Sequence, residues 1–227
     1  HASSGTTGKP TIVGYTQNDI ESWSESVARG LVSAGVGTDD VLQVCYTYGL
    51  FSGGLGLHYG AEKVGAAVVP ASTGNTERQI DLVRDLNVTV IASTPSYLLH
   101  MGEVAERMGV DIRKDTKLRL GILGAEPWSD KMRDRIYERL GIEAIDIYGT
   151  SELSGPLWCE CSQQNGIHVW ADITLIEVLD PNTGEPVPPG EKGELVVTML
   201  LKEALPIVRY RTGDVTTMSE EVCACGR

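Results

Sequence analysis

The segment SSGTTGK at residues 3–9 combines small hydroxyl residues and glycines with one cation. Glycine-freed backbone N–H groups and Ser or Thr hydroxyls form a concave set of donors that suits phosphate oxygens. The spacing differs from a Walker A loop, because only two residues separate Gly5 from Gly8 and Pro10 follows Lys9. Pro10 also disfavours an immediate helix. The segment therefore predicts either a phosphate-binding loop between extended segments or a flexible Gly/Ser-rich turn.

Two further polar clusters, GAEPWS (124–129) and IYGTSE (147–152), each follow a predicted parallel strand. Open α/β sheets bind ligands at the carboxyl ends of their strands. Glu152 is a candidate Mg²⁺ ligand, because Mg²⁺ commonly takes one or two carboxylates together with phosphate oxygens. The alternative is a helix cap formed by Thr150 or Ser151 with Glu152 nearby.

The stretch RYRTGD (209–214) places two arginines beside an acid. Asp214 can accept hydrogen bonds from a ribose, and Arg211 can face a phosphate; the alternative is a hairpin turn with an exposed ion pair. In YGLFSGGLGLHYG (48–60), Tyr48, Phe51 and Tyr59 can line a flat apolar slot in which glycines leave room for a ring. Ordinary core packing of a glycine-rich helix start is the alternative.

The chain contains five cysteines, and their uneven clustering favours a metal site over a disulfide framework. Cys161, His168, Cys223 and Cys225 form a Cys₃His set that suits tetrahedral structural Zn²⁺, and Cys159 is a spare candidate. The alternative is a group of scattered buried thiols, to which Cys45 in an apolar strand corresponds.

The segments that position these groups show alternating strand and helix patterns along the sequence. Helical patterns cover residues 19–34, 49–66, 76–87, 95–109 and 129–141, and strand patterns cover 41–48, 66–71, 88–94, 118–124 and 143–149. This order predicts an α/β fold with a mostly parallel sheet covered by helices. Beyond residue 165, short strands separated by turn signals predict a β-rich, distorted-barrel-like part.

Composition narrows the functional class. The net charge is −12, from 31 acidic against 19 basic residues, which disfavours binding to nucleic acid. No apolar run approaches the roughly 20 residues of a membrane span, so no membrane partner is expected. The cysteine pattern, which is typical of a metal site rather than of disulfides, favours a cytoplasmic location. A homodimer is compatible with the sequence, which does not determine the oligomeric state.

Taken together and in this order, SSGTTGKPT, YGLFSGGLGLHYGAEKVGAAVVP, TPSYLL, GAEPWS, IYGTSE and RYRTGD resemble the acyl-adenylate-forming superfamily, most closely its phenylacetate–coenzyme A ligase family. The resemblance covers nearly the whole chain. It implies a ligase that uses ATP and Mg²⁺ to convert a phenylacetate-like aryl carboxylate to an acyl adenylate and then transfers the acyl group to coenzyme A.

The resemblance also implies a set of site residues. Glu152, Thr7 and Lys9 would act in catalysis, with Glu152 holding Mg²⁺ beside Thr6 or Thr7. The triphosphate would be held by Ser3, Ser4, Gly5, Thr6, Thr7, Gly8 and Lys9. Adenine would be flanked by Gly124, Ala125, Glu126 and Pro127. The nucleotide or the acyl group would contact Asp146, Ile147, Tyr148, Gly149 and Thr150. Asp214 would hold the ribose hydroxyls, with Arg211 facing phosphate. The aryl pocket would contain Tyr48, Phe51, Gly53 and Pro156. Some family members carry zinc near the positions of Cys161, His168, Cys223 and Cys225.

The resemblance further predicts an α/β nucleotide- and acyl-binding part at residues 1–160 and a β-rich part at 161–227. It implies a lid domain with a catalytic lysine beyond Arg227, so the expectation is a core fragment with weak adenylation of its own. Thr150, Leu157 and Trp158 depart from the family pattern and leave the acid less defined. Adenylation of a different small acid, or a zinc-stabilised nucleotide-binding remnant without catalysis, are the alternatives.

Overall fold

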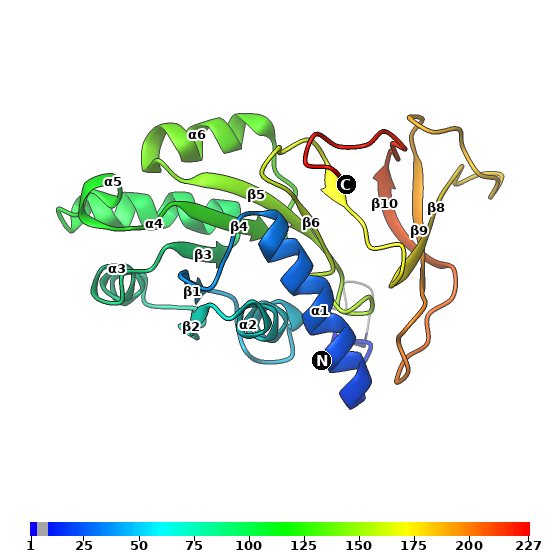
Figure 1. The fold of residues 1–227 in the computed structure, drawn as a ribbon, viewed down its shortest axis with the longest axis horizontal. Helices are drawn as coiled ribbons and strands as arrows, with labels where there is room; N and C mark the ends of the chain where they lie inside the picture. Colours follow the sequence, from blue (N-terminus) through cyan, green and yellow to red (C-terminus); the bar gives the residue numbers. More distant parts are fainter. Residues whose placement is uncertain (4–8) are drawn as a thin grey trace.

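The computed structural model describes residues 1–3 and 9–227, which form two β-sheets and the helices that cover the larger one (Figure 1). The helices are α1 (Gln17–Ser33), α2 (Ser52–Val64), α3 (Thr76–Asp85), α4 (Pro95–Arg107), α5 (Ile112–Asp115) and α6 (Asp130–Leu140). The strands are β1 (Val41–Val44), β2 (Ala67–Val69), β3 (Val90–Ser93), β4 (Leu120–Gly124), β5 (Glu143–Tyr148), β6 (Trp158–Glu160), β7 (Ile167–His168), β8 (Thr174–Leu179), β9 (Gly193–Met199) and β10 (Tyr210–Thr216).

The larger sheet has seven strands in the order β2-β1-β3-β4-β5-β6-β7. Its first five strands are parallel, and β6 and β7 continue it in antiparallel orientation. The smaller sheet is antiparallel, with the order β10-β9-β8. The prediction of a mostly parallel sheet covered by helices, followed by a β-rich part, is confirmed.

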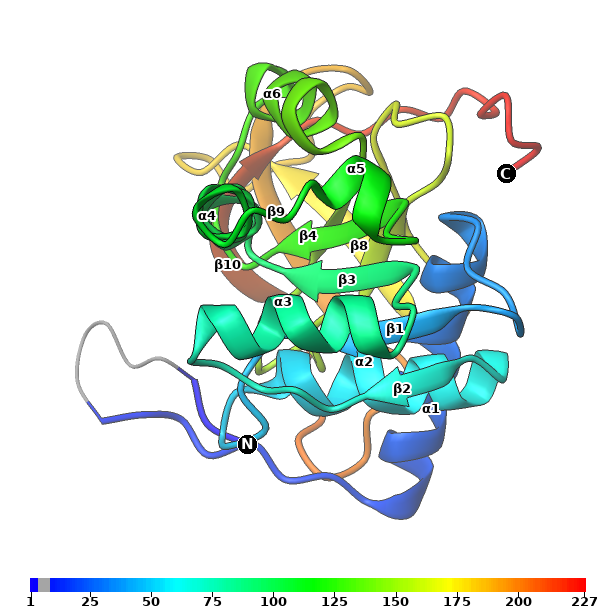
Figure 2. The same ribbon diagram turned by 90° about the vertical axis from the view of Figure 1, so that its left-hand side faces the viewer.

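Helices cover both faces of the larger sheet (Figures 1 and 2). On one face, α1 and α2 pack on apolar residues of β1, β3, β4 and β5 such as Leu42 and Ile122. On the other face, α3, α4 and α6 pack around Ile91 and Leu123. Buried strands covered on both faces must be apolar throughout, which is why LGIL in β4 shows no alternation.

The two helices α1 and α2 approach each other closely because α2 is rich in glycine. A Cβ atom at Gly56 would lie 2.5 Å from the Trp23 ring, and one at Gly60 would lie 2.4 Å from Val27. The glycine pattern of this helix is therefore largely a packing requirement between α1 and α2. The N-terminus of α1 carries a capping box, in which Thr16 caps the helix and Asp19 pairs back to the cap.

Two elements were not predicted, and most of the predicted strands are shorter than expected. The single turn of α5 is too short to show a helical period, and β6 follows a turn with no alternating pattern. β1 ends at Val44 rather than at residue 48, which places Tyr46 and Tyr48 in the loop beyond the sheet. The predicted domain division at residue 160 remains a prediction; β7 pairs with β6 in the larger sheet. Within the described residues, no helix is long and apolar enough to cross a membrane.

Candidate functional site

A cavity of about 310 Å³ opens at the carboxyl ends of β4 and β5. It is lined by Ser3, Tyr46, Phe51, Ser52, Gly53, Leu57, Ala125, Ile147, Tyr148, Gly149, Thr150, Ser151, Glu152, Gly155 and Pro156. Parallel sheets place ligand sites at this edge, so its position agrees with the sequence-based expectation. Most of the lining residues belong to two glycine-containing segments, the start of α2 and the loop after β5.

The loop that follows β5, residues 149–156, has two sides. Its cavity side carries Glu152, and its inner side carries Leu153, which is fully buried in the core cluster around Trp158 and Val197. The loop folds back tightly: a Cβ atom at Gly149 would lie 2.6 Å from the Cα atom of Gly155. The loop is therefore anchored on one side and presents its polar groups on the other.

Tyr148 connects this cavity to the smaller sheet. Its ring stacks on Trp158, and its hydroxyl group donates a 2.6 Å hydrogen bond to the Asp214 carboxylate on β10. Asp214 is thus hydrogen-bonded to a residue that lines the cavity, and its contact with a ribose remains a prediction. Arg211 instead pairs with Glu194, its Nε atom donating to the carboxylate at 2.8 Å, so its side chain is already engaged within the β-rich part.

The predicted phosphate-binding segment lies at the same rim, as far as the structure describes it. Ser3 lines the cavity, and it pairs with Thr11 through a backbone hydrogen bond of 3.0 Å and a side-chain hydrogen bond of 3.0 Å. Lys9 is exposed. Ser4, Gly5, Thr6, Thr7 and Gly8 lie outside the described residues, so their predicted contacts with phosphate remain predictions.

The predicted adenine stretch follows β4. Ala125 lines the cavity with a left-handed backbone (φ 67°), and a Cβ atom at Gly124 would lie 2.5 Å from the carbonyl oxygen of Ile147. The Glu126 carboxylate accepts hydrogen bonds of 2.7 and 2.9 Å from the backbone N–H and hydroxyl of Ser96 at the start of α4. The stretch is therefore a fixed backbone surface with Ala125 at its centre, and Pro127 adjoins it outside the lining.

Asp146 lies on the opposite face of β5 from Ile147, because side chains alternate along a strand. Its carboxylate accepts a 2.8 Å hydrogen bond from the Trp128 indole, and its backbone N–H donates to the buried Glu160 carboxylate. Glu160 also pairs with Arg133 at 3.0 Å. Burial raises the pKa of Asp146 to about 6, and the charge of Glu160 acts in the same direction. These contacts brace the strand end, and a contact of Asp146 with the nucleotide remains a prediction.

Of the predicted aryl-pocket residues, Phe51, Gly53 and Pro156 line the cavity. Tyr48 is outside the lining, and its hydroxyl lies 3.2 Å from His58 Nδ1. Tyr46 is a lining residue that was not predicted, since the apolar pattern placed it inside a strand. Its hydroxyl donates to the carbonyl oxygens of Ser93 and Gly124, at the ends of two neighbouring strands. The sequence signal that could have identified Tyr46 as a lining residue is an aromatic side chain just beyond the end of a strand.

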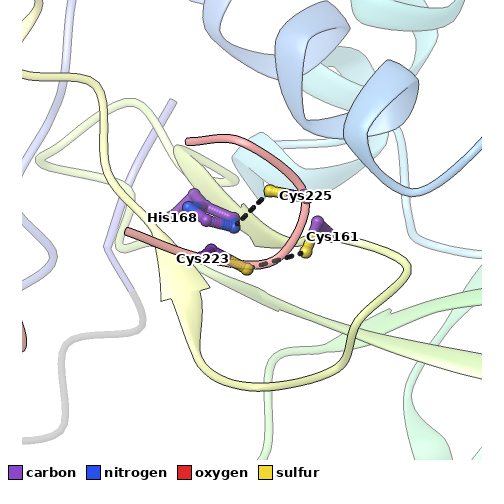
Figure 3. A group of neighbouring side chains, drawn as sticks. All are labelled: Cys161, His168, Cys223 and Cys225. Carbon is purple, nitrogen blue, oxygen red and sulfur yellow. Dashed lines mark hydrogen bonds between the residues drawn. The ribbon is translucent and has the colours of Figure 1, made fainter. Parts of the chain in front are cut away.

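The Cys₃His set is brought together from distant parts of the chain (Figure 3). Ligand atoms of Cys161, His168, Cys223 and Cys225 all lie within 4.8 Å of one another. The sulfurs of Cys161 and Cys223 are 3.8 Å apart, and that of Cys225 is 3.4 Å from His168 Nε2. The sequence interpretation of one convergent cluster is confirmed. Cys45 is buried elsewhere as a free thiol, in agreement with the expectation for that residue.

Sequence comparison defines the class to which this fold and cavity belong. Residues 3–199 match the family model described as "AMP-binding enzyme", so the chain belongs to this family. The match includes the opening Ser/Thr/Gly segment, the stretch after β4 and the loop after β5.

Within that family, the chain is similar to curated phenylacetate–coenzyme A ligases. It is 55% identical over 220 residues to the Pseudomonas putida protein and 52% identical over 220 residues to that of Escherichia coli strain K12, in both cases covering 96% of this chain and 50% of the relative. A solved structure of 2-hydroxyisobutyryl-CoA ligase in complex with 2-HIB-AMP and CoA superposes with a TM-score of 0.93 at 29% identity, covering 100% of this chain and 54% of that one. The chain thus spans about half the length of these relatives.

Proposed function

We propose that this chain forms the nucleotide- and acid-binding core of an AMP-forming acid–coenzyme A ligase that acts on an aryl carboxylate of the phenylacetate type. The main support for this proposal is the cavity of about 310 Å³, which is lined both by the loop that contains Glu152 and by apolar groups such as Phe51 and Leu57. A site for a mixed anhydride needs both surfaces, one for a phosphate and one for the acyl group. The identity of 50–55% to phenylacetate–coenzyme A ligases supports this choice of acid.

In the proposed reaction, a carboxylate oxygen of the acid attacks the α-phosphorus of ATP, and pyrophosphate leaves. The thiol of coenzyme A then attacks the acyl carbon, and AMP leaves with the electrons of the broken acyl–oxygen bond. Such phosphoryl chemistry depends mainly on positioning and on stabilising developing charge. Glu152 would hold Mg²⁺, which neutralises phosphate charge when bound. Ser3 to Lys9 would hold the phosphate chain, and Asp214, held by Tyr148, would bind the ribose.

The choice of acid is proposed to depend on the apolar wall. Phe51, Gly53 and Pro156 would face the aryl ring, with Tyr46 closing the wall beside them. Tyr46 is fixed by its hydrogen bonds to Ser93 and Gly124, so it is a rigid surface that sets the length of the acid.

The experiment that tests this function is isothermal titration of Mg²⁺–ATP into the chain, followed by acid-dependent exchange of labelled pyrophosphate into ATP in the longer protein. We expect E152Q to weaken Mg²⁺–ATP binding, and E185Q, at an exposed turn residue, to leave it unchanged. Phenylacetate should support exchange better than 2-hydroxyisobutyrate or benzoate. Absence of nucleotide binding in a folded protein contradicts the proposal, and preference for 2-hydroxyisobutyrate contradicts the choice of acid.

We also propose that the Cys₃His set holds a structural Zn²⁺ ion. Tetrahedral zinc with Zn–S bonds of about 2.3 Å and Zn–N bonds of about 2.0–2.1 Å separates two sulfurs by about 3.8 Å and a sulfur from a nitrogen by about 3.5 Å. The observed separations of 3.8 and 3.4 Å fit these values. Four protein ligands leave no position for a substrate, so the ion would clamp the C-terminal turn to β6 and β7. Elemental analysis should find about one Zn²⁺ per chain; free alkylation of Cys161 in a metal-free native protein contradicts the site.

A further inference from the structure

Lys202, in the connection between β9 and β10, is a buried cation that the proposed chemistry does not use. Its side chain is almost fully enclosed, with 6% of the residue exposed. Its ammonium group donates a 2.6 Å hydrogen bond to the Ser154 hydroxyl and lies 4.0 Å from the centre of the Tyr15 ring. Within the described residues, no ion pair involves Lys202, and residues 4–8 include no acid. A buried charge with a hydroxyl and a ring as its partners costs free energy of folding.

The nearby acid, Asp19, is occupied by other groups. Its carboxylate accepts hydrogen bonds from the backbone N–H groups of Thr16, Glu203 and Ala204. These bonds fix the backbone on the C-terminal side of Lys202 to the start of α1, and so they aim the lysine at the loop. Burial lowers the pKa of Lys202 to about 8, whereas the charge of Asp19 opposes that shift.

Lys202 contacts the inner side of the loop that lines the cavity. Ser154 lies two residues after Glu152 and has a left-handed backbone (φ 60°), a conformation that needs support from its surroundings. Tyr15 reaches the same loop, since its hydroxyl lies 3.4 Å from the carbonyl oxygen of Ser151, to which it donates. Lys202 and Tyr15 therefore hold the loop at residues on both sides of Glu152 in the sequence, and neither of them lines the cavity.

We propose that Lys202 is a positioning residue that fixes the 149–156 loop, and through it Glu152, in the geometry that receives a magnesium–nucleotide complex. The inference rests on the proposed function. Lys202 does not touch the nucleotide; it acts through Ser154 and the backbone of the loop. Its buried charge is retained against its cost in stability because the loop needs a strong donor at this point.

Two measurements, the thermal midpoint and the affinity for Mg²⁺–ATP, distinguish this positioning role of Lys202 from a purely structural role. Lys202→Met keeps the aliphatic stem and removes the charge, so its thermal midpoint should equal or exceed that of the wild type. Its affinity for Mg²⁺–ATP should fall by about tenfold, the size of one charge-assisted hydrogen bond. A residue that only supports the fold would lower the thermal midpoint and leave the affinity of the folded protein unchanged.

The experiment titrates Mg²⁺–ATP into wild type, K202M, S154A, the double variant and the control K192M, whose lysine is exposed on the turn before β9. Because both single changes remove the same hydrogen bond, the double variant should lose little more affinity than either one. Backbone hydrogen exchange at residues 150–155 should rise in K202M and S154A without nucleotide. K192M should match the wild type in all measurements.

Two results overturn the inference. One is an unchanged Mg²⁺–ATP affinity in folded K202M, and the other is unchanged hydrogen exchange in the loop. If the wild type binds no nucleotide, the proposed function fails and the role toward the nucleotide fails with it. The exchange measurement then still decides separately whether Lys202 anchors the loop.

Discussion

Asp146 offers a quantitative test of the electrostatics beneath the site. Its carboxylate is half-buried and accepts a hydrogen bond from Trp128, and burial raises its pKa from 3.8 to about 6. The folded protein therefore binds the proton more tightly than the unfolded chain does. The stability contributed by this group is fully present below about pH 4 and is lost as pH rises through about 6. A difference of about two pKa units corresponds to about 3 kcal/mol, an upper value because the side chain keeps some contact with solvent.

Asp146→Asn removes the charge and keeps an oxygen that can accept from the Trp128 indole. We expect D146N to raise the free energy of unfolding at pH 8 by about 1–3 kcal/mol and to show little gain near pH 4. Urea unfolding of both proteins from pH 4 to pH 8 gives this difference directly, and groups that titrate equally in both cancel. D134N, at an exposed acid on α6, is the matched control. A difference that stays constant across this range would refute the reasoning.

Three further changes test contacts that support the cavity: the close approach at Gly149, the Arg133–Glu160 ion pair and the Cys₃His cluster. Gly149→Ala would place a Cβ atom 2.6 Å from backbone across the loop, so it should lower the thermal midpoint and abolish nucleotide binding, whereas G37A, in open space, should do neither. Arg133→Met leaves the buried Glu160 carboxylate without its partner and should cost about 3–5 kcal/mol in urea unfolding, with the exposed R135M near zero. If the Cys₃His set holds Zn²⁺ as proposed, a chelator should lower the thermal midpoint measured by circular dichroism and increase proteolysis of the C-terminal turn.

The parallel layer of the fold was predictable because its signals are local. Val and Ile runs between amphipathic segments identify strands covered on both faces, and Pro95 after Thr94 identifies the start of α4. The antiparallel strand β6 was not predictable in this way, because WCE is too short to show a pattern. Its place in the sheet is set by the return of the 149–156 loop and by the burial of Trp158 against Tyr148.

The site was predictable where a motif carries its chemistry in adjacent residues. Glu152, Ala125 and Phe51 line the cavity as expected, and the Cys₃His set converges. Apart from the Cys₃His set, whose residue types indicate a shared metal site, contacts between distant segments could not be obtained from the sequence. Examples are the hydrogen bond from Tyr148 to Asp214, which spans the two sheets, and the occupation of Arg211 by Glu194. The first depends on how the smaller sheet packs against the larger one, and the second depends on the pairing of β10 with β9; no local pattern encodes either.

Three sets of side-chain contacts link the smaller sheet, and the segments that flank its strands, to the larger sheet and the loop after β5. Tyr148 donates a hydrogen bond to Asp214, Lys202 donates one to Ser154, and the Cys₃His cluster brings the C-terminal turn beside β6 and β7, where the proposed Zn²⁺ ion would join them. Packing of Leu195 and Val197 on Trp158 and the hydrogen bonds from Glu203 and Ala204 to Asp19 also hold the smaller sheet, so no single contact sets its orientation alone. The position of Asp214 relative to Glu152 therefore depends on the whole interface between the two sheets. Mutation of the cluster should consequently lower the thermal midpoint more than it weakens nucleotide binding, because the remaining contacts still hold the smaller sheet against the 149–156 loop.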